Sequence, residues 1–156
     1  MKQIVLTKAR VAVVDDEDFS RLSITKWFAV DCAGSFYART HIGGGKQEYM
    51  HRIVMNAPRG MQVDHVNHDT LDNRKENLRL CTQSQNNANM RKPSGKWSSR
   101  YKGVTWHSKR RKWCAHGRVN GRYTHLGLFV TEEDAARAYD ANARKQYGDF
   151  ALVNFQ

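Results

Sequence analysis

The chain has 156 residues, a formal net charge of +11 and a pI near 9.9, with 40% hydrophobic and 26% charged residues. This size allows one ordinary domain or two small ones, and the composition suits a folded chain that is attracted to polyanions. Three scattered cysteines without a Cys-x-x-Cys pair argue against a zinc ribbon or a disulfide framework, and favour a reducing compartment. No apolar run approaches the ~20 residues of a membrane span, and no signal-peptide pattern opens the chain, so we expect a cytoplasmic protein without a membrane partner.

The first 45 residues or so predict short strands and turns. An apolar run at residues 12–14 is followed by an acidic cluster, Asp15–Asp18. Such a cluster is compatible with a metal site, but more often it opens a helical turn, because carboxylates accept the free N–H groups there and suit the helix dipole. We therefore interpret the cluster as a helix start.

Three glycines at 43–45 precede Lys46 and have the composition of a phosphate-binding loop. The segment lacks the Gly-Lys-Ser/Thr ending and the helix that such a loop requires. It lies instead between two runs typical of strands, residues 35–39 and 48–55. A hairpin turn is the better interpretation.

Residues 61–89 carry the most informative pattern of the chain. Asp64 and His65 are adjacent, Asn77 follows twelve positions after His65, and Asn86 lies 22 positions beyond Asp64. Phosphodiester hydrolysis needs a base that activates water and positive charge near the phosphoryl oxygens. His65 suits the base because imidazole titrates near neutral pH, and Asp64 with Asn86 offers hard oxygen ligands to one divalent ion such as Mg²⁺.

Geometry limits how this pattern can fold. Neighbouring strand residues point to opposite faces, so Asp64 and His65 can serve one phosphate only if the strand ends or bends there. Residues 66–69 are polar and turn-prone, which meets this need. Farther on, Thr82 and Gln85 have the spacing of a capping box, so we expect a helix that carries Asn86 near its start. The predicted order is strand, loop, strand, helix.

This order and spacing resemble the HNH (ββα-metal) nuclease finger of phage and intron-borne homing endonucleases. The resemblance implies that an asparagine at position 77 accepts the other ring N–H of the catalytic histidine and so orients it. His51 also resembles a family position, which we interpret as structural support beneath the finger. His68 falls where relatives usually have glycine or another small residue, and we assign it no role.

Residues 93–99 are rich in Pro, Ser, Gly and Lys and predict a linker. The expected organisation is a nuclease region at 1–92, with the finger at about 50–92, and a DNA-binding domain at 100–156. Between Arg91 and His125 there are eleven Lys and Arg and no Asp or Glu. A solvated surface normally mixes both signs of charge, so this run indicates a nucleic-acid contact.

The C-terminal region predicts strands followed by one helix. Residues 113–119 alternate, which places Trp113, Ala115, Gly117 and Val119 on an inner face and Lys112, Cys114, His116 and Arg118 on an outer one. Residues 119–122 have the pattern of a hairpin, and 131–147 predict an alanine-rich helix with Thr131 as its cap and Gly148 at its end.

From about residue 99 to 155 the sequence resembles an APETALA2-type (ethylene-response-factor) DNA-binding domain. The residues that carry this resemblance are Tyr101–Val104, Lys112-Trp113, Leu126–Phe129, Thr131–Asp140 and Asn154-Phe155. It implies a three-stranded antiparallel sheet in the DNA major groove with one helix behind it. The expected DNA contacts are Lys102, Thr105, His107, Arg110, Arg111, His116, Arg118, Tyr123 and His125.

Thr105, His107, His116 and His125 replace residues that are typically arginine, glutamate or tryptophan in plant members. The target sequence therefore does not carry over from the resemblance.

Taken together, the sequence predicts an α+β protein with a ββα-metal finger, N-terminal strands, and a small three-stranded antiparallel sheet packed on one helix. The expected function is site-selective, metal-dependent cleavage of double-stranded DNA by a monomeric phage or bacterial homing-type endonuclease. The expected place of action is the cytoplasm of the bacterial or infected cell. The alternative is a DNA-binding regulator with an inactive finger. A structured-RNA binder is disfavoured, because a sheet inserted in the major groove does not suit A-form RNA.

Overall fold

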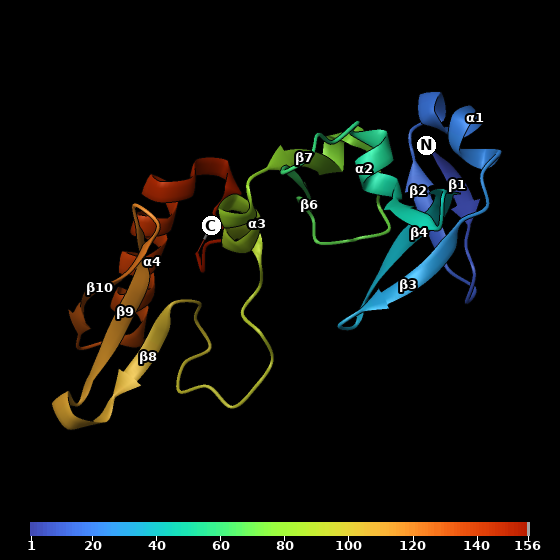
Figure 1. The fold of residues 1–156 in the computed structure, drawn as a ribbon. Coiled ribbons are helices and arrows are strands. Elements are labelled where there is room, and N and C mark those ends of the chain that lie inside the picture. The colour runs from blue at the N-terminus through green and yellow to red at the C-terminus, as the bar shows by residue number, and fades with distance from the viewer. Residues whose placement is uncertain (156) are drawn as a thin grey trace. The chain divides into compact units, whose positions relative to one another are not determined.

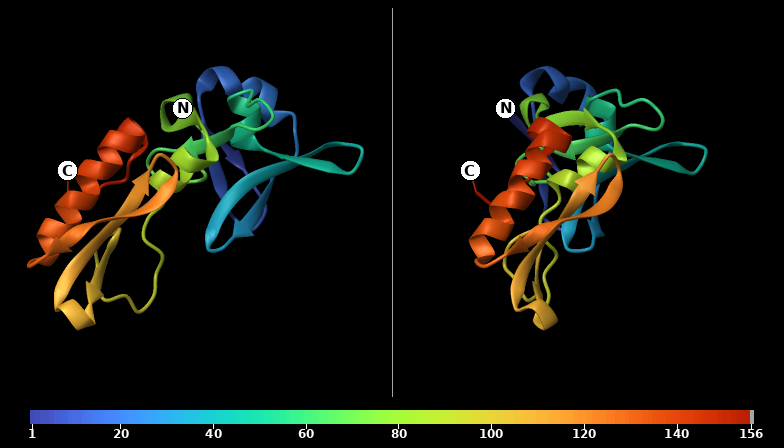
Figure 2. Two further views of the ribbon diagram at one scale, coloured as in Figure 1. Left: turned by 60° about the vertical axis from the view of Figure 1, so that its left-hand side comes forward. Right: turned by 90° about the vertical axis from the view of Figure 1, so that its left-hand side faces the viewer.

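The computed structural model describes residues 1–155 (Figures 1 and 2). The chain divides into two compact units, Met1–Gln83 and the residues from Ser84 onward. The elements of the first unit are β1 (Lys2–Val5), β2 (Val11–Val14), α1 (Asp16–Ser23), β3 (Phe28–Cys32), β4 (Ser35–Gly43), β5 (Lys46–Tyr49), α2 (Met50–Val54), β6 (Gln62–His65), the 3-10 turn η1 (Lys75–Asn77) and β7 (Leu78–Cys81).

The elements that follow are α3 (Gln83–Asn89), β8 (Val104–His107), the 3-10 turn η2 (Ser108–Arg110), β9 (Lys112–Val119), β10 (Arg122–Phe129), α4 (Glu132–Tyr147) and the 3-10 turn η3 (Gly148–Phe150). The predicted finger order is confirmed, since β6, a loop, β7 and α3 follow one another along the chain. None of the helices within the described part of the chain is both long and apolar enough to cross a membrane.

The first unit is built from three small antiparallel sheets, β1–β2, β3–β4–β5 and β6–β7. Alternate residues of β2 enter its core, where Ala12 and Val14 are fully buried. Met50 of α2 is also fully buried in this core. The three small sheets contribute to one core, and the removal of its apolar side chains from water is the main contribution to the stability of this unit.

The acidic cluster begins a helix, as expected. Asp16, Glu17 and Asp18 form the first turn of α1. The cluster also binds the segment before β7, because the Lys75 amide donates to Asp15 Oδ2 at 2.8 Å and the Lys75 ammonium pairs with Glu17. These contacts join α1 to the loop of the predicted finger.

The expected hairpin at Gly43–Gly45 is confirmed, since β4 and β5 pair on either side of it. The strand predicted at 48–55 is wrong beyond Tyr49, where the chain turns into α2. The reason is burial spacing: Met50 and Val54 lie four residues apart and both face the core, which a helical turn brings about.

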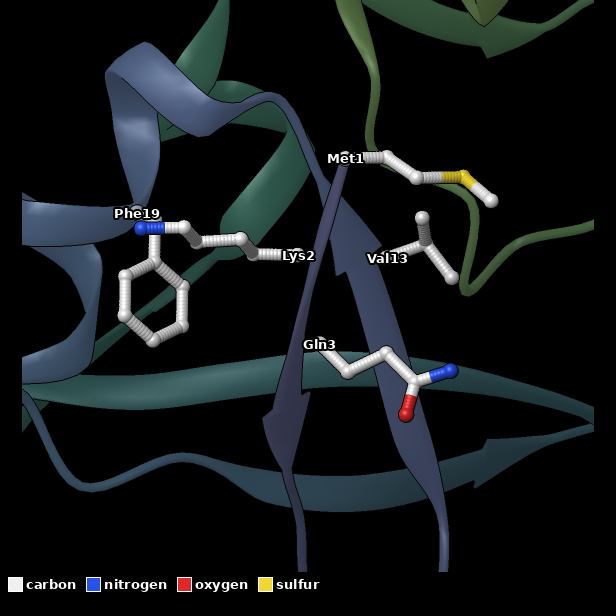
Figure 3. A pocket seen from close by; sticks show the side chains of 5 residues that line it. All are labelled: Met1, Lys2, Gln3, Val13 and Phe19. Atoms are coloured by element: carbon white, nitrogen blue, oxygen red, sulfur yellow. The ribbon is translucent and has the colours of Figure 1, made fainter.

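A shallow hollow lies beside β1 and α1 (Figure 3). Its lining consists of Met1, Lys2, Gln3, Val13 and Phe19, and the Lys2 ammonium lies 4.8 Å from the centre of the Phe19 ring. None of these residues belongs to the predicted site.

The second unit contains the expected sheet of three antiparallel strands in the order β10–β9–β8, with α4 packed along it (Figures 1 and 2). Thr131 caps the helix as predicted, accepting a hydrogen bond from the Asp134 amide at 3.1 Å. Ala135, Ala136 and Ala143 are buried at the contact. Their small side chains let helix and sheet approach closely.

A buried carboxylate fastens the end of the chain to this helix. Asp140 is 1% exposed, and it accepts hydrogen bonds from the backbone amides of Asn154 and Phe155 at 2.8 and 2.9 Å. The Asn154 carboxamide in turn bonds both backbone groups of Lys102. The residues after α4 thus complete the packing of the second unit.

Helix α3 is also bonded into the second unit, whereas the sequence placed it in a nuclease region that extends to residue 92. The ammonium of Lys102 donates to the carbonyls of Ala88 and Met90, each at 2.6 Å, and the Leu152 amide donates to Ala88 at 3.1 Å. These bonds satisfy carbonyls at the end of α3 that no helical partner reaches. Burial lowers the pKa of Lys102 to about 8.

Two glycines test the close packing of this unit. Gly103 has φ +76°, and a Cβ there would lie 2.0 Å from the Tyr139 ring, whereas Gly121, at φ +78°, has nothing within 4 Å. Gly121→Ala should therefore cost only the left-handed backbone strain of about 1–2 kcal/mol. Gly103→Ala should cost about 1–3 kcal/mol more, because Tyr139 must move. Urea unfolding of the two variants measures the difference, and equal midpoints would contradict this packing.

Candidate nuclease site and DNA-binding face

The candidate site lies where β6 ends. Asp64 and His65 are the last two residues of the strand, each 6% exposed, and they pair with Arg79 and Leu78 of β7. Directly after His65 the chain turns, with the His68 amide donating to the His65 carbonyl at 3.1 Å. The strand therefore ends at His65, where the sequence led us to expect an end or a bend.

The turn holds His68 in an unusual backbone conformation. His68 has φ +66°, in the left-handed region that favours glycine. This agrees with the resemblance, in which relatives usually carry a small residue there.

Asp64 forms an ion pair with Arg79, the residue opposite it on β7. The Nε and Nη2 atoms of Arg79 donate to Asp64 Oδ2 at 2.9 and 2.8 Å. A buried carboxylate is costly unless it is paired or bound to a cation, and Arg79 provides a counter-charge here. A divalent ion bound to Asp64 would either accept the carboxylate together with Arg79 or displace the Arg79 guanidinium from it.

Asn73 is a partner of His65 that the sequence did not indicate. It is 1% exposed, and its side chain interacts with the His65 imidazole in the sense that favours the charged ring, which opposes the lowering of the His65 pKa. Its own Nδ2 also donates to the Leu71 carbonyl at 3.0 Å. Nothing in the sequence distinguishes Asn73 from an ordinary turn asparagine, because its burial follows from the loop packing against β2, where its amide donates to Val13.

Asn77 fastens the loop that follows His65. Its Oδ1 accepts from the Asn67 amide at 2.9 Å, its Nδ2 donates to the Asp72 carbonyl at 2.8 Å, and its own carbonyl accepts from the Val66 amide. Three bonds therefore fasten both ends of the loop that follows His65. The expected hydrogen bond of Asn77 to the His65 ring stays a prediction.

An aromatic cluster covers the other side of His65. The His51 ring lies 5.1 Å from the His65 ring and edge-on to it, and Tyr37 and Tyr49 lie within 6 Å of His51. His51 is 8% exposed, which is consistent with its expected structural role. Burial is the main cause that lowers the pKa of His51 to about 3 and that also lowers the pKa of His65. Both rings are therefore neutral at pH 7.

The available donors suit a hard cation. Asp64 offers a carboxylate and Asn86 a carboxamide oxygen, which are ligand types that Mg²⁺ prefers, and no soft sulfur donor is among them. Asn86 lies in α3, in the other compact unit, so its expected pairing with Asp64 stays a prediction.

The three-stranded sheet of the second unit presents the predicted outer face. Arg118 pairs with Tyr123, and His116 with His125, across β9 and β10. On the opposite face, Ala115 is fully buried and Gly117 contacts α4. The expected strand register is therefore confirmed.

Several predicted DNA contacts are exposed on or beside this face, namely Thr105, Arg110, Arg111, Arg118, Tyr123 and His125. Arg110 and Arg111 lie at the turn between β8 and β9, as expected. Arg118 Nη1 donates to the Gly121 carbonyl at 2.7 Å. His107 and His116 are half-buried, and the Lys102 ammonium is engaged by α3, so its expected DNA contact stays a prediction.

Comparison with known proteins supports both resemblances, to HNH nucleases and to AP2-type domains. Residues 48–88 match the family model described as HNH endonuclease. This segment is an HNH endonuclease domain. It spans β6, β7 and most of α3, and it includes Asp64, His65, Asn77 and Asn86.

The chain is similar to a viral nuclease and to plant transcription factors. An uncharacterized HNH endonuclease of Acanthamoeba polyphaga mimivirus is 36% identical over 116 residues, which cover 70% of this chain and 58% of the viral protein. The AP2-like ethylene-responsive transcription factors AIL6 and ANT of Arabidopsis thaliana are 41% and 32% identical over 86 and 139 residues, covering 52% and 78% of this chain. The chain spans only 15% and 25% of these plant relatives. No solved structure matches the chain.

The buried histidine pair generates a prediction for NMR. In the metal-free protein, the imidazole signals of His51 should titrate with a midpoint far below 6.5, and those of His65 also below 6.5, because burial disfavours the charged form. Asp64→Asn should lower the His65 midpoint further, since the Asp64 carboxylate favours imidazolium. A His65 midpoint at or above 6.5 would contradict the described burial.

Proposed function

We propose that this protein is a site-selective DNA endonuclease of the homing type, which hydrolyses phosphodiester bonds with His65 as general base and one divalent ion, Mg²⁺ or similar. The single observation that supports this best is the placement of Asp64 and His65. They lie side by side at a strand end, held by Asn77 and contacted by Asn73, within an HNH endonuclease domain.

The lowered pKa of His65 supports its role as base. A neutral imidazole at pH 7 has a lone pair that can take a proton from water, which an imidazolium lacks. The buried Asn73 side chain interacts with this ring. Asn77 maintains the loop that follows and is a positioning residue in this proposal.

Asp64 and Asn86 would hold the ion. When bound, it would polarise the phosphoryl group and stabilise charge on the leaving oxygen. Arg79 pairs with Asp64 in the metal-free protein and so limits the desolvation cost that an isolated buried carboxylate would suffer. An ion bound to Asp64 would release the guanidinium of Arg79 to contact a phosphate.

The second unit would bind duplex DNA through its sheet. The face that carries Arg118, Tyr123 and His125 is exposed, and the flanking turn holds Arg110 and Arg111. The similarity to AP2-like transcription factors supports DNA as the ligand of this unit. We propose that the chain acts as a monomer, with one unit reading the DNA and the other cutting it.

His65→Ala tests the chemistry. The variant should lose cleavage of long duplex DNA by orders of magnitude and keep near-wild-type affinity, because His65 performs chemistry rather than anchoring. Single-turnover cleavage and binding measured in parallel separate these effects, with Asp64→Ala as a second variant and EDTA as the metal-removal control. Full activity in EDTA or in His65→Ala would contradict the mechanism. Wild-type protein that binds DNA but never cleaves it would favour the regulator alternative.

Arg118 and the turn arginines should play different roles in DNA binding. Arg118→Ala should cost about 1–3 kcal/mol on the preferred site and relax selectivity at one or two base pairs, because a guanidinium in the major groove reads guanine O6 and N7.

The matched control is the double change of Arg110 and Arg111 to Ala. It should weaken binding to all duplexes alike and reduce the slope of log affinity against log salt by about 0.9 for each phosphate that the variant no longer neutralises. If Arg118→Ala weakens preferred and random DNA equally, Arg118 contacts phosphate only.

A further inference from the structure

Three side chains with metal-binding atoms converge on the outer face of the second unit. They are Cys114 and His116 of β9 and His125 of β10, and their ligand atoms all lie within 4.8 Å of one another. Cys114 Sγ lies 3.3 Å from His116 Nε2 and 2.9 Å from His125 Nδ1. These residues are remote in sequence from the oxygen donors of the nuclease finger.

Strand geometry places the three side chains together. Cys114 and His116 are two residues apart on β9 and so share a face, and His125 pairs with His116 across the strands. A bulge between His125 and Gly127 shifts the register at this point. Bulges redirect neighbouring side chains, which accounts for the diagonal approach of His125 to Cys114.

The cluster is built into the unit rather than spread over its surface. Cys114 is 4% exposed, so the thiol is covered while His125 remains open to solvent. The His116 ring stacks on Tyr123, with ring centres 5.3 Å apart and planes inclined by 12°. This stacking limits rotation of the imidazole and directs Nε2 towards the sulfur.

The distances suit a tetrahedral ion. With metal–sulfur and metal–nitrogen bonds of about 2.3 and 2.0 Å, a sulfur–nitrogen edge of a tetrahedron measures about 3.5 Å. The two sulfur–nitrogen distances here are 3.3 and 2.9 Å, so these edges would lengthen by about 0.2 and 0.6 Å to accommodate the ion. The nitrogen–nitrogen distance, at most 4.8 Å here, would settle near about 3.3 Å. One thiolate and two imidazoles are a ligand set that selects Zn²⁺ over Mg²⁺.

We propose that Cys114, His116 and His125 form a second metal site, which binds Zn²⁺ or a similar soft divalent ion with water as its fourth ligand. Binding displaces the thiol proton of Cys114 to solvent, while each neutral imidazole gives a nitrogen lone pair. The bound centre carries a net charge of +1, from the ion and one thiolate, on the face with the basic residues. This proposal for a second metal site does not depend on whether the protein is a nuclease.

A simpler interpretation is that the thiol merely hydrogen-bonds two imidazoles. Burial raises the pKa of the Cys114 thiol and lowers the pKa of His116, so both groups are neutral at pH 7 without a metal. One thiol can donate its proton to one imidazole nitrogen and accept an N–H bond from the other. This pair of hydrogen bonds is the competing arrangement, and metal titration distinguishes it from a shared ion.

Cobalt substitution tests the site. The reduced full-length protein is titrated with Co²⁺ in a large excess of Mg²⁺, which occupies oxygen-donor sites. We expect one equivalent to bind with a thiolate-to-cobalt charge-transfer band, visible bands typical of tetrahedral Co²⁺, and release of one proton. One equivalent of Zn²⁺ should remove both sets of bands.

Variants identify the ligands. Cys114→Ser should abolish the charge-transfer band, and His125→Gln, at an exposed position that should not disturb folding, should weaken Co²⁺ binding by more than about 100-fold. Cys32→Ser and His41→Gln are matched controls at exposed positions outside the cluster and should bind like the wild type. Absence of the band in the wild-type protein, or an unchanged titration in His125→Gln, would overturn the proposal.

Discussion

The loop between β6 and β7 is the constraint on which the candidate nuclease site depends. A regular strand would direct Asp64 and His65 to opposite faces. The chain turns immediately after His65, and Asn77 fastens both ends of the loop with bonds to Val66, Asn67 and Asp72. Because these bonds are internal to the first unit, the histidine is positioned before any metal or DNA arrives. Such preorganisation is what a base must have to act at a defined phosphate.

Burial then determines the electrostatics of the site. The aromatic cluster around His51 keeps His65 neutral, and Arg79 compensates the carboxylate of Asp64. In the second unit a buried carboxylate is likewise stabilised by partners, because Asp140 accepts hydrogen bonds from the backbone amides of Asn154 and Phe155.

Helix α3 belongs to the matched HNH segment, yet Lys102 donates hydrogen bonds to the carbonyls of its last residues. The same helix therefore lies in the matched HNH segment and packs in the second unit.

The sequence predicts those features that rest on local patterns. The ends of α4 follow from Thr131 and Gly148, and the finger order follows from the spacing of polar residues and strands. It does not predict features that arise only when distant strands pair. Asn73 becomes a partner of His65 through packing of its loop on β2, and Met50–Val54 becomes helical because two of its apolar residues share the core. Likewise, Cys114 and His125 meet only through the register and bulge of β9 and β10.

The two units have a joint function in this proposal, in which one selects the DNA position at which the other cuts. The most direct measurement is to select the preferred duplex from a random pool and map protection and Mg²⁺-dependent cleavage on it at nucleotide resolution. We expect the wild-type protein to cut at a reproducible position relative to the protected sequence, and only when the metal is present. Cuts scattered without relation to that sequence, or protection without any cleavage, would contradict this division of roles.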